Sequence, residues 1–270
     1  MLALALDRFL ERASVAQKLR SLDKIERTVE RALAVAFDAQ GKAFVKRFAS
    51  LQYRFQESVS PADWLPLLDE VKATTDHLFW QAIQDGIGQA LQIGADDTIA
   101  ALGDLGAGIS FTLKHPVAVE YLRTHAAWAV TQIDDTTRDY LNTIITTGVD
   151  EGWSYDRMAR AIIDRYAGFG ISKPQLHIRS RAHLIAITEM GQAYELAGRA
   201  VVDDLAAAGL DMEKQWLTVG DNRVSDGCKD NQAAGWVKLD SEFPSGHQHP
   251  LRFPGCRCTV LYRRKPRIGR

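Results

Sequence analysis

Cysteine is scarce in this sequence, and its three thiols cannot all pair with one another. Only one residue separates Cys256 from Cys258, which leaves too little chain for an unstrained bridge between them. A disulfide-stabilised secreted protein is therefore disfavoured. A reducing compartment is the better expectation, and there clustered cysteines more often bind metals than form disulfides.

Long apolar runs are also missing. No stretch reaches the roughly 18 apolar residues that a membrane-spanning helix needs. The chain begins with the apolar segment MLALAL, but acidic and basic residues follow at once in helical spacing. A secretory signal would instead have a basic start and a small-residue cleavage site. We therefore expect no signal peptide and no association with a membrane.

An excess of charge of one sign is absent from the chain as a whole. Its 33 basic and 34 acidic residues give a formal net charge of −1, so the total charge points to no partner. The distribution is uneven, because seven basic and no acidic residues lie between positions 252 and 270. The last five are Arg263, Arg264, Lys265, Arg267 and Arg270. This tail is expected either to contact DNA phosphates or an acidic protein surface, or to be an ordinary solvated terminus.

Recognisable catalytic patterns are missing too. The glycines between Gly86 and Gly108 do not form a Gly-x-x-x-x-Gly-Lys-Ser/Thr phosphate loop, and no clear strand precedes them. No Ser-His-Asp arrangement has a supporting context, and no pair of carboxylates has a spacing that argues for catalysis. The sequence therefore offers none of these catalytic arrangements.

Helical periodicity is what the sequence does contain. From residue 14 to 60, apolar side chains recur every three or four positions with charged residues between them, and Gly41 is predicted to break the pattern. Pro61 suits the first turn of a second helix. The glycines from Gly86 to Gly108 predict a flexible connection between helical units.

Further helices are expected after this connection. Pro116 opens a helical stretch that runs to about residue 147, and Ser154 is the predicted N-cap of the next helix. Ser172 and Gln175 match a capping box, which predicts the start of a helix that ends near Gly209. Up to this point the chain has the pattern of an all-α protein.

The periodicity changes after Gly209. The segments KQWLTV, WVKLD and CTVLYR are short and rich in β-forming residues, and turn residues separate them. The predicted fold class is therefore mainly α, with long amphipathic helices followed by a small irregular α+β module over residues 210–270. A module with so few apolar residues often needs a cross-link to be stable, and a bound metal ion can provide one.

Potential metal ligands gather in this module. Zinc prefers four ligands drawn from thiolates and imidazoles. Five are available: Cys228, His247, His249, Cys256 and Cys258. The favoured set is the three cysteines with one of the two histidines, in a closed structural site that clips the segment around Cys228 to the C-terminal strand. The spacing does not match two Cys-x-x-Cys knuckles, so the alternative is that the cysteines are small buried apolar residues and the histidines lie in a loop.

A metal-dependent hydrolase that cleaves nucleic acid is the alternative function. It would combine the cysteine and histidine cluster with Asp221, Asp226 and Asp230, beside the basic tail. The segment DNRVSDGCKDNQ is equally typical of a turn-rich loop, in which Asp and Asn bind their own backbone. Both interpretations stay open at the level of the sequence.

Four segments of the chain resemble, in order, the elements of one known family. They are a helical lead-in, IDDTTRDYLNTIITTGVDEGWS, a helix with Arg-Ala and Thr-Glu, RAHLIAITEMGQAYELAG, a Trp-x-Thr and Asp-x-Arg-Val element, WLTVGDNRVSDGC, and a closing Cys-Arg-Cys strand, FPGCRCTVLYR. Residues 130–262 thus resemble the phage Mu protein F-like head morphogenesis family, the minor head proteins of tailed bacteriophages. The first 115 residues or so carry no such match.

Two positions depart from the family pattern. Ser225 stands where the family often has a second cysteine, three positions before Cys228. Phe253 precedes Pro254 where the family tends to have His-Pro, and a His-Pro pair occurs four residues earlier, at His249. If a metal site is ancestral to the family, this chain has moved its histidine ligand or lost the site.

The resemblance implies a structural or assembly protein of the virion and not an enzyme. Such a protein associates with the portal, the major capsid protein or a scaffold protein during head assembly in the host cytoplasm. It ends in the head interior and contacts double-stranded DNA during packaging or ejection. The implied division is an N-terminal helical region with its glycine-rich connection over 1–115, the helical part of the Mu F-like domain over 116–209, and the small α+β module over 210–270.

Overall fold

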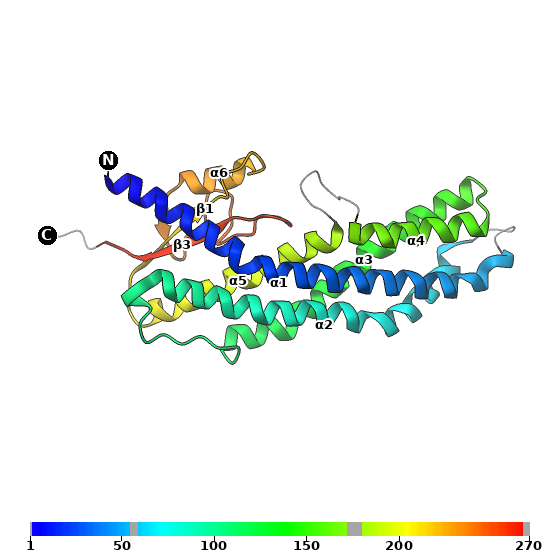
Figure 1. Cartoon of the computed structure of the whole chain (residues 1–270), viewed down its shortest axis with the longest axis horizontal. Coiled ribbons are helices and arrows are strands. Elements are labelled where there is room, and N and C mark those ends of the chain that lie inside the picture. Colours follow the sequence, from blue (N-terminus) through cyan, green and yellow to red (C-terminus); the bar gives the residue numbers. More distant parts are fainter. Residues whose placement is uncertain (1, 55–58, 172–179, 267–270) are drawn as a thin grey trace. The chain divides into compact units, whose positions relative to one another are not determined.

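The computed structural model describes the chain over residues 2–54, 59–171 and 180–266. Within these ranges it is mostly helical, with a small sheet near the C-terminus, so the predicted fold class is confirmed (Figure 1). The elements are α1 (Leu2–Phe48), η1 (Ala49–Arg54), α2 (Pro61–Leu102), η2 (Gly103–Leu105), α3 (Pro116–Asp150), α4 (Tyr155–Ile171), α5 (Arg181–Ala207), β1 (Met212–Leu217), α6 (Asp226–Ala233), β2 (Trp236–Lys238) and β3 (Thr259–Arg264). No helix in these ranges has the length and apolar character that crossing a membrane requires.

Side chains cap the helix starts, and they explain where the helices begin. Asp63 in the first turn of α2 accepts hydrogen bonds from the backbone N–H and the hydroxyl of Ser60, at 2.9 and 2.8 Å. The hydroxyl of Ser154 accepts from Arg157 N at 3.3 Å, which confirms the predicted cap of α4. Ser180 caps α5 in the same way, whereas the capping box at Ser172 lies outside the described residues.

The chain forms two compact units. We call them the sheet unit (Met1–Glu26, Gly86–Leu122 and Ile187–Arg270) and the bundle unit (Arg27–Asp85 and Arg123–Ala186). Four helices, α1, α2, α3 and α5, contribute residues to both units. The division into 1–115, 116–209 and 210–270 stays a prediction about sequence organisation.

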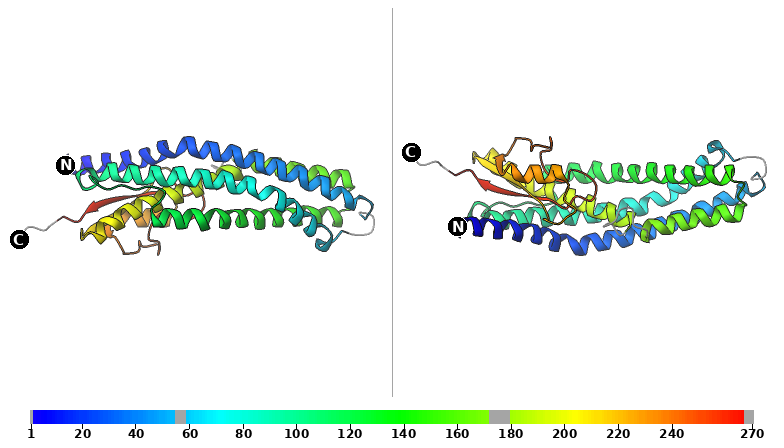
Figure 2. Two further views of the ribbon diagram at one scale, coloured as in Figure 1. Left: turned by 90° about the horizontal axis from the view of Figure 1, so that it is seen from below. Right: turned by 90° about the horizontal axis from the view of Figure 1, so that it is seen from above.

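The bundle unit is built around an aromatic core. In both views of Figure 2 the segments of α1, α2, α3 and α4 that form this unit lie side by side. The ring of Phe37 on α1 makes edge contacts with Phe79 on α2 and Phe169 on α4, each at 4.9 Å between centroids. The predicted apolar stripe of α1 is therefore the face that packs into this core.

Two predictions about glycine were wrong, because these glycines provide close helix packing rather than breaks. Helix α1 continues through Gly41, where a Cβ atom would lie 2.6 Å from the side chain of Tyr166 on α4. Helix α2 continues through Gly94, where a Cβ would lie 2.3 Å from the carbonyl oxygen of Tyr194 on α5. The predicted connection shrinks to the segment from Gly103 to Gly108, whose end glycines have φ of 55° and 89°.

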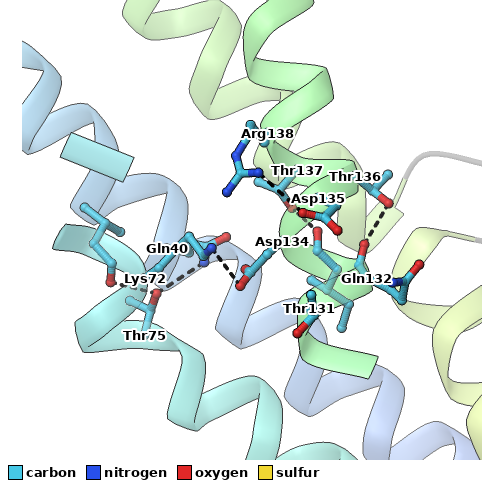
Figure 3. Close-up of polar contacts among 12 residues, drawn as sticks. Gln40, Lys72, Thr75, Thr131, Gln132, Asp134, Asp135, Thr136, Thr137 and Arg138 are labelled. Carbon is cyan, nitrogen blue, oxygen red and sulfur yellow. Dashed lines mark hydrogen bonds and ion pairs between the residues drawn. The ribbon is translucent and has the colours of Figure 1, made fainter. Parts of the chain in front are cut away.

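A buried polar layer interrupts the apolar core of the bundle unit. Figure 3 shows Lys72 and Thr75 of α2 and Gln40 of α1 near Asp134 of α3. Lys72 Nζ lies 3.0 Å from one carboxylate oxygen of Asp134, and Gln40 Nε2 donates to Thr75 Oγ1 at 3.2 Å. Among the described residues, Oδ1 of Asp134, Oδ1 of Asp76 and Oε1 of Gln40 are buried without a hydrogen-bond partner. One proton held between the two carboxyl groups would relieve the cost of burying both as anions.

The stability of the bundle unit is expected to fall as pH rises. Burial, followed by the nearby Asp134 carboxylate, raises the pKa of Asp76 from 3.8 to about 6, against the opposing charges of Lys72 and His77. Between pH 3.8 and about pH 6 the folded state therefore binds more protons than the unfolded state. The free energy of unfolding decreases as pH rises through this range. Because Asp76 is partly exposed, we expect about 1–2 kcal/mol rather than the full linkage value.

Urea unfolding at pH 4 and pH 7 checks this expectation. The Asp76→Asn variant should lose most of the difference between the two pH values, while Asp69→Asn provides a control on the same helix. An unchanged pH dependence in the Asp76 variant would show that another group causes it.

The small sheet has the strand order β2-β1-β3 and is antiparallel throughout. The three predicted β segments are therefore confirmed. Gln215 pairs with Trp236 on β2, and Trp216 pairs with Val260 on β3. Trp216 is fully buried and marks the face of the central strand that covers the small core of the module.

Candidate metal centre

Cys228 lies on a short helix that the sequence did not predict. The segment interpreted as a turn-rich loop contains α6, which begins after Ser225 in the extended conformation typical of an N-cap residue. Cys228 is in the first turn, and its backbone N–H donates to Ser225 O at 3.0 Å. The thiol therefore sits at the positive end of a helix, which favours a thiolate.

The other two cysteines lie at the start of β3. Cys256 N donates to Phe253 O at 3.1 Å, which closes a turn, and Gly255 occupies the left-handed region at φ 82°. Gly255 N donates to the Thr188 hydroxyl of α5 at 2.9 Å, so α5 fixes the turn that carries Cys256. Cys258 directly precedes β3, whose pairing with β1 holds it in place.

The three cysteines meet in one cluster. Their sulfur atoms all lie within 4.8 Å of one another, and the residues are 1%, 5% and 3% exposed for Cys228, Cys256 and Cys258. The Cys228 and Cys256 sulfurs are 4.0 Å apart. Three thiolates bound to one zinc at about 2.3 Å would be separated by about 3.8 Å, so this cluster has the donor type and spacing of a metal site. Three clustered, buried cysteines of this kind could hold a metal ion.

The electrostatics of the cluster favour one thiolate. Hydrogen bonds from the Cys256 and Cys258 thiols lower the pKa of Cys228, and the Ser225 hydroxyl and the Arg252 guanidinium act in the same direction. The same interaction with Cys228 raises the pKa of Cys256 and of Cys258. These directions favour Cys228 as the thiolate, with the other two thiols as its hydrogen-bond donors.

An apolar shell surrounds the sulfur atoms. Trp216 and Phe243 pack beside the cysteines with their rings 5.2 Å apart in an edge arrangement, and Leu251 packs against the same core. Gly191 on α5 leaves room for Leu251, since a Cβ there would lie 3.2 Å from its methyl group. This enclosure is typical of a structural metal site rather than a catalytic site with an open ligand position.

The histidines were predicted to supply the fourth ligand, and neither joins this cluster among the described residues. His247 Nδ1 lies 2.9 Å from Ser245 O, and His249 Nδ1 lies 2.6 Å from Pro250 O. Both contacts place the hydrogen on Nδ1 and leave the lone pair on Nε2. The structure therefore brings together three of the five predicted ligands.

Comparison with known proteins places this site in a family. Residues 139–261 match the family model described as phage Mu protein F like protein. These residues belong to the phage Mu protein F-like family. The match covers less than half of the chain but includes all three cysteines. The family comprises phage head morphogenesis proteins, which are generally structural rather than enzymatic. No curated protein and no solved structure shows significant similarity to the chain.

The carboxylates of the Mu F-like region do not support the alternative of a hydrolase. Asp221 is paired with Arg223 at 2.8 Å and with Arg257 at 2.5 Å. Asp226 is exposed and pairs with Lys229 at 2.8 Å. Within the described residues, no Asp, Glu or His side chain joins the three thiols. Asp221 and Asp226 therefore serve surface ion pairs.

Two buried lysines support the Mu F-like region, and sequence analysis missed both. Lys18 Nζ on α1 donates to Cys258 O at 2.7 Å and lies 2.8 Å from the Glu195 carboxylate of α5. Lys214 Nζ on β1 donates to the carbonyl and side-chain oxygens of Gln248, at 2.7 and 2.9 Å, and burial lowers its pKa to about 8. A signal existed for Lys18, because it lies four residues before Leu22 on the apolar stripe of α1.

The basic tail is partly neutralised by acidic neighbours. Arg263 forms hydrogen bonds of 3.0 and 3.1 Å with Glu213, and its guanidinium lies 4.0 Å from the ring centre of Trp236. Lys265 is 3.7 Å from Asp211. Arg264 is exposed, and the last two arginines of the predicted contact set, Arg267 and Arg270, lie outside the described residues.

Proposed function

We propose that this protein is a minor head protein of a tailed phage. It would bind the portal, the major capsid protein or a scaffold protein while heads assemble in the host cytoplasm, and would end in the head interior. The match of residues 139–261 to the phage Mu protein F-like family carries this proposal. The enclosed cysteine cluster supports docking rather than chemistry as the task of the C-terminal module.

We propose in addition that Cys228, Cys256 and Cys258 hold a structural zinc ion. The donor set supports zinc, because three buried thiols at this spacing suit a soft, tetrahedral site. His247 or His249 is the proposed fourth ligand, since the Nε2 lone pair of each remains available. The ion would tie α6 directly to the start of β3, two elements that are otherwise linked through β1.

Exposed tryptophans on the helices support a protein partner. Trp80 on α2 is 42% exposed and Trp128 on α3 is 51% exposed, and tryptophan is enriched among residues that dominate binding energy at interfaces. Trp128 also contacts His125, with ring centres 5.0 Å apart. A large apolar ring left in water is stabilised when a partner covers it.

Co-sedimentation of the purified protein with portal rings and with capsid shells of the same phage tests the proposal. The full chain should bind one of them, and Trp128→Ser should weaken this binding about tenfold or more. Val35→Ser is the matched control, because Val35 is also strongly exposed on a helix of the bundle unit. Absence of the protein from purified virions, and normal heads after its deletion, would reject a role in the head.

DNA contact through the basic tail is part of the same proposal. Arg264, Arg267 and Arg270 are its carriers, because Arg263 and Lys265 already face carboxylates. Binding of duplex DNA should weaken steeply as salt rises. Replacing Arg264, Arg267 and Arg270 with glutamine, which leaves the length of β3 intact, should remove this binding. Equal binding by this variant would remove DNA contact from the function of this tail.

A further inference from the structure

The side chain of Arg252 lies against the helix turn that carries Cys228. Its Nη2 atom donates to the Ser225 hydroxyl at 3.3 Å. A Cβ atom on Gly227 would lie 3.0 Å from the central guanidinium carbon and 3.2 Å from Nε. A side chain at position 227 would therefore push the guanidinium away from the backbone before Cys228 by a few tenths of an ångström.

Arg252 has an unused donor in this position. Its Nε atom is buried and has no hydrogen-bond partner among the described residues. No carboxylate in the described part of the chain pairs with this guanidinium, although Arg223, Arg257 and Arg263 all have one. A buried N–H donor without a partner costs free energy, so its burial in this fold calls for a compensating interaction.

The charge of a loaded metal site supplies that interaction. Three thiolates around one divalent ion leave a net charge of −1, and a neutral histidine as fourth ligand would not change it. A buried net charge is costly unless an opposite charge lies beside it. The apolar shell formed by Trp216, Phe243 and Leu251 offers no such charge. Lys18 donates to Cys258 O, but its charge is already paired with the buried Glu195 carboxylate. The Arg252 guanidinium lies beside the first turn of α6.

We propose that Arg252 is the counter-charge of the three-cysteine metal centre. This inference rests on the proposed zinc site. The guanidinium offsets the residual negative charge of the loaded cluster, and its Nε–H is the donor available to a metal-bound thiolate. Arg252 is thus a positioning residue that acts on the sulfur ligands, and Gly227 makes room for its guanidinium.

Competition of the full chain with a chromophoric chelator for Zn²⁺ tests this assignment. Arg252→Gln should weaken zinc binding roughly 10- to 100-fold, the range for residues that support metal ligands. Arg252→Lys should recover part of the loss. Gly227→Ala keeps the charge but displaces the guanidinium, so it should also weaken binding.

Arg257→Gln is the matched control. Arg257 lies between two of the cysteines in sequence and carries the same charge, but its guanidinium binds Asp221. It should bind zinc within about threefold of the unmodified chain, a difference below 1 kcal/mol. The thiolate-to-Co²⁺ absorption of each variant checks that all three sulfurs still bind metal, independently of affinity.

The outcomes separate the two proposals. If the unmodified chain binds neither Zn²⁺ nor Co²⁺, the metal centre itself is wrong and Arg252 has no charge to balance. If the chain binds zinc and Arg252→Gln behaves like Arg257→Gln, the metal centre stands and the role of Arg252 is overturned.

Discussion

Replacing Cys256 with serine is expected to remove zinc from the protein and to destabilise the C-terminal module strongly. A bound ion stabilises the folded state by about 4 kcal/mol when free zinc exceeds the dissociation constant a thousandfold. Serine is a poor zinc ligand, and only two thiols of the cluster would remain. Since α6 and the start of β3 meet at these sulfurs, their loss frees both elements at once.

Chemical unfolding with and without a strong chelator measures this effect. The unmodified chain should lose several kcal/mol on chelation, whereas Cys256→Ser should be insensitive to the chelator. The two proteins should have similar stability once zinc is removed, apart from the packing difference between a thiol and a hydroxyl. Full zinc content in the serine variant, measured by elemental analysis, would contradict the proposed ligand set.

Replacing Lys18 with methionine is the second change with a large expected effect. Lys18 and Glu195 are both almost fully buried and lie 2.8 Å apart, and Lys18 also donates to Cys258 O. Without the lysine, the Glu195 carboxylate stays buried with no counter-charge at this position. Removing one partner of a buried pair typically costs about 3–5 kcal/mol.

Two further variants separate charge burial from packing. The double variant Lys18→Met with Glu195→Leu should recover much of the lost stability, because no isolated charge remains. Lys42→Met is the surface control, since its pair with Asp38 on α1 is exposed and should contribute less than about 1 kcal/mol. Urea unfolding at neutral pH measures both losses. If Lys18→Met and Lys42→Met lowered the free energy of unfolding equally, the buried pair would stabilise the protein no more than the exposed pair.

Periodicity predicted the helices well, and glycine misled the prediction of their ends. Apolar spacing predicts which face of a helix is buried, and the burial of that face stabilises α1, α2 and α3. The same glycine can end a helix or allow another chain to approach, and the local sequence does not distinguish these uses. At Gly41 and Gly94 the partners are Tyr166 and Tyr194, which lie far along the chain. Contacts with residues distant in sequence therefore determine that these helices continue, which local helix propensity does not predict.

The cysteine cluster was predicted in part for a similar reason. Cysteine is rare here, so its concentration near the C-terminus was informative, and the three thiols do meet. Helix α6 is short and polar with one inward thiol, which gives no period to detect. The positions of His249 and Arg252 depend on how their loop folds over α6, and sequence spacing does not encode that path. Lys18 lies more than two hundred residues from Cys258, so only the fold connects them.

The place of Lys18 also bears on how such proteins can be recombined. It comes from outside the Mu F-like residues 139–261, yet it neutralises a carboxylate inside them and holds the carbonyl of a cysteine. A chimaera that joins this family segment to a foreign N-terminal half would contain the Glu195 carboxylate without the Lys18 ammonium group that neutralises it. Exchange between phages at this boundary would succeed only when the incoming half carries an equivalent base, or when Glu195 changes with it.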